Sequence, residues 1–232
     1  EFRMFRNHSL KKKLLLTTLV SGLFFLVFGL LYVQYIKSTL AEEVMDKRSD
    51  ELRLILDERL KAKEEFGLGL AVMLADSPRL RNAYFSGVRD PAVLELERII
   101  RTFRDTTNYR GLRVQIHTSE GYSWLRSWSP ENHGDDVRFR PSIQRMLKEK
   151  RPFGSADEAG RAGFAVRGLA PIIDAGDYLG SIEVLQGVGS ISRDFEQDGA
   201  AYVLLLSRDL QANAPGLAGN LAIQNYILAN NN

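Results

Sequence analysis

The spacing of hydrophobic and polar residues divides the chain into a helical first part and a strand-rich second part. Residues 14–36 contain no charged side chain, and about 20 consecutive apolar residues span the hydrocarbon core of a bilayer. Residues 37–75 contain no proline, and apolar side chains recur there at helical spacing. The pattern predicts a transmembrane helix over 14–36 that continues as a long stalk helix over 37–75.

Beyond residue 75 the pattern changes from helical spacing to the alternation of strands. Pro78 and Pro91 each begin a predicted helix, because proline is tolerated at the first helical position. After Gly111, the segments "GLRVQIHT" and "YSWLRSW" flank a Ser-Glu-Gly turn and predict a hairpin. Pro141 begins a further short helix, and helices kept apart from an antiparallel sheet predict an α+β fold. Three strand-like runs complete the expected sheet, at 153–156, 163–173 and 178–186.

The basic residues are unevenly placed along the chain. Residues 1–13 carry five Lys or Arg and one Glu, and the rest of the chain has a net charge of −2, against +2 for the whole. Basic residues beside an apolar run stay in the cytoplasm, so we expect residues 1–13 to form a cytoplasmic tail, the helix to lie in the inner membrane and the body to lie in the periplasm. A cleaved signal peptide is the alternative, although its apolar region is typically about 7–15 residues long.

The composition argues against nucleic-acid binding and against an enzyme. The near-neutral body lacks the basic surface that nucleic-acid binding requires. The chain has no cysteine, no Gly-rich phosphate loop, no nucleophile elbow and no His pair at metal-ligand spacing. His133 with Asp135 and Asp136 would supply half of a metal site, but "PENHGDD" is typical of a solvated turn. We therefore predict a non-enzymatic domain without a cofactor or a metal.

The segment "WLRSW" is the first candidate for a binding site. In an extended strand, alternate side chains share a face, so Trp124, Arg126 and Trp128 are expected on one side, opposite Leu125. A guanidinium between two indoles can line the wall of a site for a small anionic or aromatic ligand. The alternative is a structural stack in which the rings shield the arginine through cation–π contacts.

Three further arginines are expected beside this strand. Arginine grips carboxylates with two parallel hydrogen bonds and stacks on aromatic rings, and a partly buried guanidinium needs an anion as its partner. That anion is either a bound ligand or an acidic side chain of the protein, with Asp135, Asp136 and Glu183 as the internal candidates. The predicted ligand-binding residues are Trp124, Arg126, Trp128, Arg138, Arg140 and Arg167.

The order of the elements resembles that of a known sensory family. The segments "YSWLRSWSPENHGDDVRFRPSIQRM" and "GFAVRGLAPIIDAGDYLGSIEVLQGVGSISRDFEQDG" are similar to the PAS-like Cache modules of bacterial transmembrane receptors, in particular to the double-Cache type of chemoreceptors and sensor kinases. The resemblance covers about residues 38–210. It implies a membrane-distal Cache module over 76–199. A single module would be followed by a terminal helix and a second membrane span, but "AYVLLLSRDLQ" has only six consecutive apolar residues. We therefore expect residues 200–232 to begin a second, truncated module.

This resemblance implies a function as well as a fold. The first hypothesis is the ligand-sensing periplasmic domain of a methyl-accepting chemotaxis protein, which binds a small molecule and transmits a signal across the membrane. Such receptors are homodimers, which makes the helix from Ser38 the expected subunit contact. The alternatives are the ectodomain of a sensor histidine kinase and a membrane-anchored adaptor domain without a small ligand.

Overall fold

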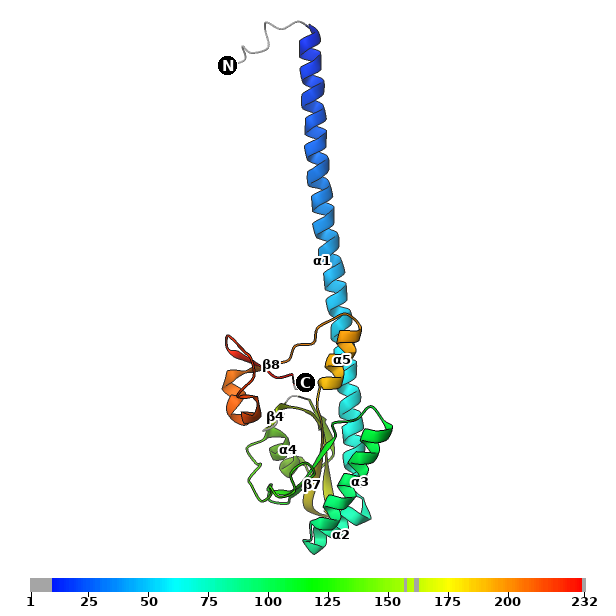
Figure 1. The fold of residues 1–232 in the computed structure, drawn as a ribbon, viewed down its shortest axis with the longest axis vertical. Coiled ribbons are helices and arrows are strands. Elements are labelled where there is room, and N and C mark those ends of the chain that lie inside the picture. The colour runs from blue at the N-terminus through cyan, green and yellow to red at the C-terminus, as the bar shows by residue number, and fades with distance from the viewer. Residues whose placement is uncertain (1–9, 157, 161–162, 231–232) are drawn as a thin grey trace. The chain divides into compact units, whose positions relative to one another are not determined.

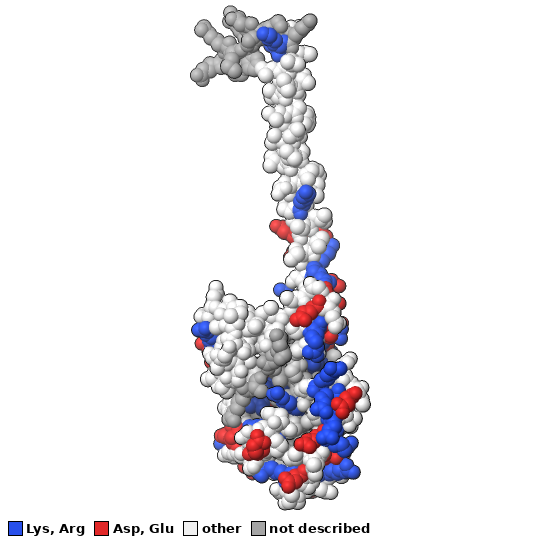
Figure 2. Space-filling view, viewed as in Figure 1, with Lys and Arg blue, Asp and Glu red and all other residues white. Residues whose placement is uncertain are grey.

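A computed structural model describes residues 10–156, 158–160 and 163–230, and its contacts divide the chain into two units, Glu1–Ile55 and Leu56–Asn232. The helix α1 (Leu10–Ala75) contains every described residue of the first unit. Figure 2 shows part of this helix as a white column, as expected for the charge-free residues 14–36. Among the described residues, α1 is the one helix that is long and apolar enough to cross a membrane. The unbroken helix agrees with the sequence pattern, and the membrane crossing stays a prediction.

The second unit is built on a five-stranded antiparallel sheet with the order β2-β1-β7-β6-β3. Its strand β7 is labelled in Figure 1. The structure confirms the α+β fold, the hairpin and the later strands. The run at 163–173 is divided, because its first two residues form a separate short strand with β4. The strands are β1 (Arg113–Thr118), β2 (Ser123–Arg126), β3 (Phe153–Ser155), β4 (Ala159–Gly160), β5 (Gly163–Phe164), β6 (Val166–Asp174) and β7 (Asp177–Gln186).

Helices cover both faces of this sheet. On one face, residues of α1, α2 (Pro78–Ser86) and α3 (Asp90–Thr106) share a core with β1, β6 and β7, including Leu74, Leu96 and Ile116. On the other face, α4 (Pro141–Glu149) packs Ile143 and Met146 against β3 and β6. The helix α5 (Gly189–Gln197) follows β7 and was not predicted, because it is short and buries only three side chains.

The helix α1 approaches strand β6 closely enough to require glycine on both sides. A Cβ atom at Gly168 would lie 2.1 Å from the backbone carbon of Gly67 and 2.1 Å from the nitrogen of Leu68. One strand further, the side-chain Nε2 of Gln186 donates a hydrogen bond of 2.6 Å to the carbonyl oxygen of Lys63. The segment of α1 from Lys63 to Leu68 is therefore held directly against the backbone of the sheet.

The C-terminal residues form a small sheet of their own. The strands β8 (Leu205–Ser207), β9 (Ala222–Ile223) and β10 (Tyr226–Leu228) pair in the order β8-β10-β9. Two short 3-10 helices, η1 (Arg208–Asn213) and η2 (Pro215–Leu217), connect β8 with β9. Leu206, Leu217 and Ile227 form a separate apolar cluster in this segment. Its assignment to the start of a second sensory module stays a prediction.

Candidate ligand-binding site

One face of the five-stranded sheet carries a set of buried polar side chains. Gln115 lies opposite Arg126 on β2 and opposite Glu183 on β7, and residues directly opposite each other share a face. Arg167 on β6 lies opposite Leu185, two residues from Glu183, and therefore belongs to the same face. The buried polar residues of this face are Gln115, His117, Ser123, Arg126, Arg167, Ser181 and Glu183.

The expectation that Trp124 shares a face with Arg126 is wrong, because β2 contains a bulge. Leu125 lies opposite Ile116, but the next residue of β1 lies opposite Ser123, so the pairing passes over Trp124. A bulge of this kind adds one residue to one strand and interrupts the alternation of its side chains. Trp124 consequently joins Leu125 in the core on the face covered by α1, α2 and α3, and Arg126 stays on the polar face.

The two tryptophans of "WLRSW" have different surroundings. The ring of Trp124 lies 5.0 Å from that of Tyr84 in an edge-to-face contact, and the Nε atom of Arg89 donates a 2.9 Å hydrogen bond to the Trp124 carbonyl. Trp128 is 38% exposed, and the guanidinium carbon of Arg113 lies 5.6 Å from its ring centre. Trp124 is therefore a core residue, whereas Trp128 remains accessible to a ligand.

Arg126 has an internal carboxylate partner. Its two Nη atoms each donate a 2.8 Å hydrogen bond to Asp135, and Nη1 also donates to the carbonyl oxygen of Asn132 at 2.6 Å. Arg138 forms a similar but exposed pair with Asp136, with contacts of 2.7 and 3.0 Å. Both acidic residues were among the internal partners considered from the sequence.

Glu183 is the centre of a buried ionic network. Both of its oxygens accept hydrogen bonds from Arg140, with 2.8 Å between Arg140 Nη1 and Oε2. Arg167 Nε lies 2.9 Å from Oε1, although the alignment is not that of a hydrogen bond. Arg140 Nε also donates to Glu158 at 2.6 Å, and Arg167 donates to the Glu158 carbonyl oxygen. The two guanidinium groups and the two carboxylates balance in charge.

The pKa shifts in this network follow from burial and pairing. Burial by itself would raise the pKa of Glu183, but the Arg140 guanidinium outweighs burial and holds the pKa of this carboxyl well below its usual range. The pKa of Glu158 is also lowered, because Arg140 and Arg167 outweigh its burial. Both carboxyl groups are therefore ionised at neutral pH.

His117 borders the same network. Its Nδ1 lies 3.1 Å from the hydroxyl of Ser181, and its Nε2 lies 3.4 Å from Glu183. Burial lowers the pKa of His117, and the nearby Glu183 opposes this shift without reversing it. His117 is consequently a neutral, buried side chain at pH 7, and the network keeps its balance of charge.

A cavity of about 2070 Å³ opens at the end of the sheet where β1 begins and β7 ends. Its wall includes residues along α5, from Gly189 to Gln197, and part of α1 near Lys63. Four of the six predicted site residues line it, namely Arg126, Trp128, Arg140 and Arg167. Neither Trp124 nor Arg138 is among the lining residues. No group of His, Asp or Glu within the described ranges is arranged to hold a metal ion.

The cavity also has charged and aromatic lining residues that were not predicted. Arg110 precedes β1 and Arg113 is its first residue; both are exposed, and Phe139 lies in the loop before α4. Gln186 lines the cavity from β7 and contacts α1. The alternation of "GLRVQIHT" could have indicated that Arg113 lines the cavity, because it places the Arg113 side chain on the same face as Gln115.

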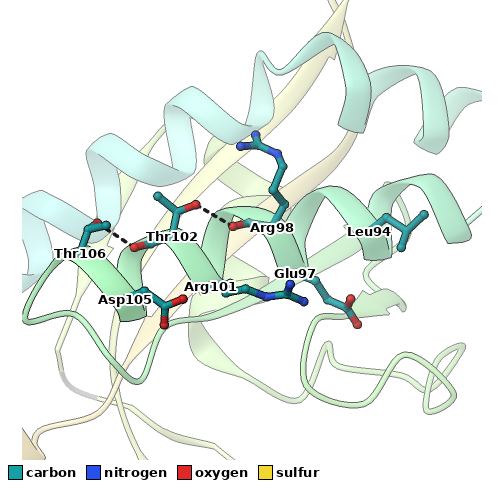
Figure 3. Close-up of a pocket in the computed structure, with 7 residues that line it drawn as sticks. All are labelled: Leu94, Glu97, Arg98, Arg101, Thr102, Asp105 and Thr106. Atoms are coloured by element: carbon teal, nitrogen blue, oxygen red, sulfur yellow. Dashed lines mark hydrogen bonds between the residues drawn. The ribbon is translucent and has the colours of Figure 1, made fainter.

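A second hollow, of about 450 Å³, lies on the outer side of α3 and is shown in Figure 3. The side chains that line it all come from this one helix. Thr102 and Thr106 bond to carbonyl oxygens one turn earlier. A hollow formed by one exposed helical face does not enclose a ligand, so the cavity at the end of the sheet is the better candidate. The lining residues are Leu94, Glu97, Arg98, Arg101, Thr102, Asp105 and Thr106.

Comparisons with known proteins agree with this fold. The family model described as the double sensory domain of two-component sensor kinases matches residues 46–231. A domain of a protein assigned to the sensory box/GGDEF family of Vibrio parahaemolyticus has 11% identity and a TM-score of 0.53, with 70% of this chain and 68% of that chain covered. The extracellular domain of a protein assigned as a histidine kinase has 11% identity and a TM-score of 0.51, with 70% and 64% covered.

The sensor domain of Escherichia coli DcuS has 15% identity and a TM-score of 0.46, with 59% of this chain and 97% of that chain covered. No curated protein sequence matched the chain.

Proposed function

The chain belongs to the double-Cache family of sensory domains of two-component sensor kinases, and from this membership we propose that it binds a small anionic molecule and passes the signal along α1. The ligand site is the cavity at the end of the sheet. The domain itself performs no chemistry, and its output depends on a signalling part of the full protein. The family description favours a sensor kinase, one of the alternatives considered from the sequence, over a chemotaxis receptor.

The charge of the cavity lining is the observation that carries this proposal. Eight Lys or Arg residues and two Asp residues line the cavity. Concave surfaces lined by one sign of charge concentrate ligands of the opposite sign. The buried carboxylates of Glu183 and Glu158 neutralise Arg140 and Arg167, and the lining still retains an excess of positive charge. This excess supports an anionic ligand.

The contact between the cavity and α1 supports a route for the signal. Arg59, Ala62 and Lys63 of α1 form part of the cavity wall. Gln186 lines the same cavity and donates to the Lys63 carbonyl. A ligand that prefers one arrangement of Gln186 and α1 shifts the population of helix positions by its difference in affinity for the two arrangements.

We further propose that α1 anchors the domain in the inner membrane, with residues 1–13 in the cytoplasm and the sensory unit in the periplasm. The support is the charge-free run over 14–36 and the basic residues before it. We propose a homodimer in which α1 provides the contact between subunits. Reporter fusions at residue 100 test the topology, and a cytoplasmic signal from that position would contradict it.

A thermal-shift screen of the full chain in detergent micelles tests the ligand site. Small organic acids, amino acids and neutral metabolites are added singly, and we expect members of the acidic group to raise the melting temperature. Ala165→Trp, which fills the cavity from its wall, should abolish the shift. Arg101→Trp, in the hollow on α3, should leave the shift unchanged.

A shift that persists in Ala165→Trp would place the ligand elsewhere. A screen in which no compound changes the melting temperature would favour the adaptor alternative.

A further inference from the structure

The deep arginines of the cavity already have partners. Arg126 is held by Asp135, Arg140 by Glu183 and Glu158, and Arg167 by Glu183. A ligand anion that replaced any of these contacts would leave a carboxylate without its counter-charge, and for the buried Glu158 and Glu183 this costs several kcal/mol. The ligand is therefore expected to use cations that have no such partner.

Arg110 and Arg113, at the rim of the cavity, are among the lining arginines that meet this condition, as is Arg193 on α5. Arg110 and Arg113 are exposed, line the cavity and form no ion pair or hydrogen bond through their guanidinium groups with any described residue. Arg113 is the first residue of β1 and lies opposite Leu185. Its planar guanidinium presents a fork of donors that matches a carboxylate.

Accessible aromatic rings lie at the same rim. Trp128 is 38% exposed and Phe139 is 44% exposed, and both line the cavity. Arg113 is already stacked beside the Trp128 ring at 5.6 Å. Burial of a large aromatic side chain is favourable, and aromatic rings prefer offset or edge-to-face contacts with other rings. A small hydrophilic anion would satisfy Arg113 but leave the exposed part of the Trp128 ring in water.

A ligand with a flat ring and one carboxylate satisfies both groups at once. Its carboxylate would meet the free edge of the Arg113 guanidinium, and its ring would cover Trp128. We propose that Arg113 and Trp128 select the ligand of this cavity and that the ligand is an aromatic carboxylate. This inference rests on the proposed ligand-sensing function and adds the chemical class of the ligand and the residues that recognise it.

Three probes of similar size separate the contributions of charge and ring. Benzoate has both features, cyclohexanecarboxylate has the charge without the aromatic ring, and benzamide has the ring without the charge. Binding to the full chain in detergent micelles is measured by isothermal titration calorimetry and by tryptophan fluorescence. The chain has two tryptophans, and Trp128 is the accessible one. Benzoate should bind more tightly than either other probe and should change the fluorescence.

Variants then assign the contacts. Arg113→Gln should weaken benzoate binding by at least about tenfold, the scale of a charge-assisted hydrogen bond. Arg113→Lys should recover little, because an ammonium group does not provide the planar fork. Trp128→Leu should remove the preference for benzoate over cyclohexanecarboxylate. Arg104→Gln is the matched control, since Arg104 is exposed on α3 and outside the cavity lining, and it should bind benzoate as the parent does.

The outcomes separate this inference from the function on which it rests. Equal binding of benzoate and cyclohexanecarboxylate, or of benzoate and benzamide, would overturn the aromatic carboxylate class. Unchanged benzoate affinity in Arg113→Gln would overturn the role of Arg113. If none of the three probes binds but another metabolite produces a thermal shift that Ala165→Trp abolishes, the sensing function stands and this inference is wrong. If no compound binds at all, both are wrong.

Discussion

The carboxylate of Glu183 accepts hydrogen bonds from both Nη atoms of Arg140, and both side chains are almost completely buried. This pair joins β7 to the residue that precedes α4. Burial of two charges is costly, and removal of one partner leaves the other charge uncompensated. The arrangement is therefore more sensitive to single substitutions than to replacement of both residues.

Arg140→Met should lower the free energy of unfolding by about 3–5 kcal/mol, because Glu183 and Glu158 lose their main counter-charge. The double variant Arg140→Met/Glu183→Met should lose less than the single variant, since Arg167 and Glu158 still balance each other. Urea denaturation of both proteins measures the difference. A double variant less stable than Arg140→Met would contradict this account.

The stability of the domain should decrease as the pH falls below about 6.5, the usual pKa of histidine. Burial lowers the pKa of His117, so the unfolded chain binds a proton at a higher pH than the folded chain does, and acid favours unfolding. The loss of stability should continue until the pH reaches the lowered pKa of His117 in the folded protein. The carboxyl groups with lowered pKa values contribute their own losses only below about 4.3, where unfolded glutamates take up protons.

His117→Gln should flatten the dependence of stability on pH between 7 and 5.5, measured by denaturation at a series of pH values. His133→Gln provides the control, because His133 is exposed in a loop and should leave the slope unchanged. A slope that persists in His117→Gln would assign the effect to another group.

Replacement of the two tryptophans should have unequal effects on stability. Trp124→Ala should cost about 3–5 kcal/mol, because the ring is packed in the core beside Tyr84. Trp128→Ala should cost about 1 kcal/mol or less, since this ring is partly exposed and loses chiefly its contact with Arg113. Thermal melting of the two variants compares them directly, and equal losses would show that Trp128 is also a structural residue.

Arg126→Ala should reduce stability more than ligand affinity. Its guanidinium is held by Asp135 in a partly buried, two-contact pair, and the loss is expected to be about 1.5–3 kcal/mol. Arg138→Ala is a matched control with an exposed pair to Asp136, and such pairs contribute little because the solvent screens them. A large loss of affinity in Arg126→Ala without a change in melting temperature would restore Arg126 as a direct ligand contact.

Gly168→Ala should destabilise the domain, because the added methyl group would meet the backbone of α1 at 2.1 Å. Gly69→Ala, in the helix α1 itself, is the control, since a Cβ atom there has no neighbour within 4 Å. Replacement of glycine by alanine at an open helical position stabilises by about 0.8–1.0 kcal/mol. The two variants should therefore shift the melting temperature in opposite directions, and a stabilised Gly168→Ala would contradict the close approach.

The elements of the second unit could be predicted because their hydrophobic spacing is regular. The alternation of "GLRVQIHT" persists in β1, and proline stands at the start of α2 and α4. The helix α5 could not be predicted in this way, because its nine residues carry few apolar side chains. Short elements of this kind depend on contacts with the rest of the fold rather than on their own pattern.

The candidate site was predictable in part, from residue types rather than from positions. The arginines were expected to need an anion, either a ligand or an acidic side chain, and the structure pairs them with Asp135, Asp136 and Glu183, together with Glu158, which was not predicted. The sequence could not decide between these partners and a ligand, because pairing depends on distances across the sheet. The position of Trp124 could not be predicted either. The bulge in β2 interrupts the alternation of side chains between the two faces, and no glycine or proline in the sequence marks it.

The bulge gives β2 an unusual tolerance to a change in length. If Trp124 were absent, Ser123 would still face His117, Leu125 would still face Ile116 and Arg126 would still face Gln115, in an uninterrupted ladder. Trp124 is thus an insertion into a strand that is already complete. A deletion of this residue would remove the packing against Tyr84. The side chains of Leu125 and Arg126 would nevertheless stay on the faces of the sheet that they occupy now. A one-residue deletion at this position would therefore leave Arg126 on the side of the sheet that lines the cavity.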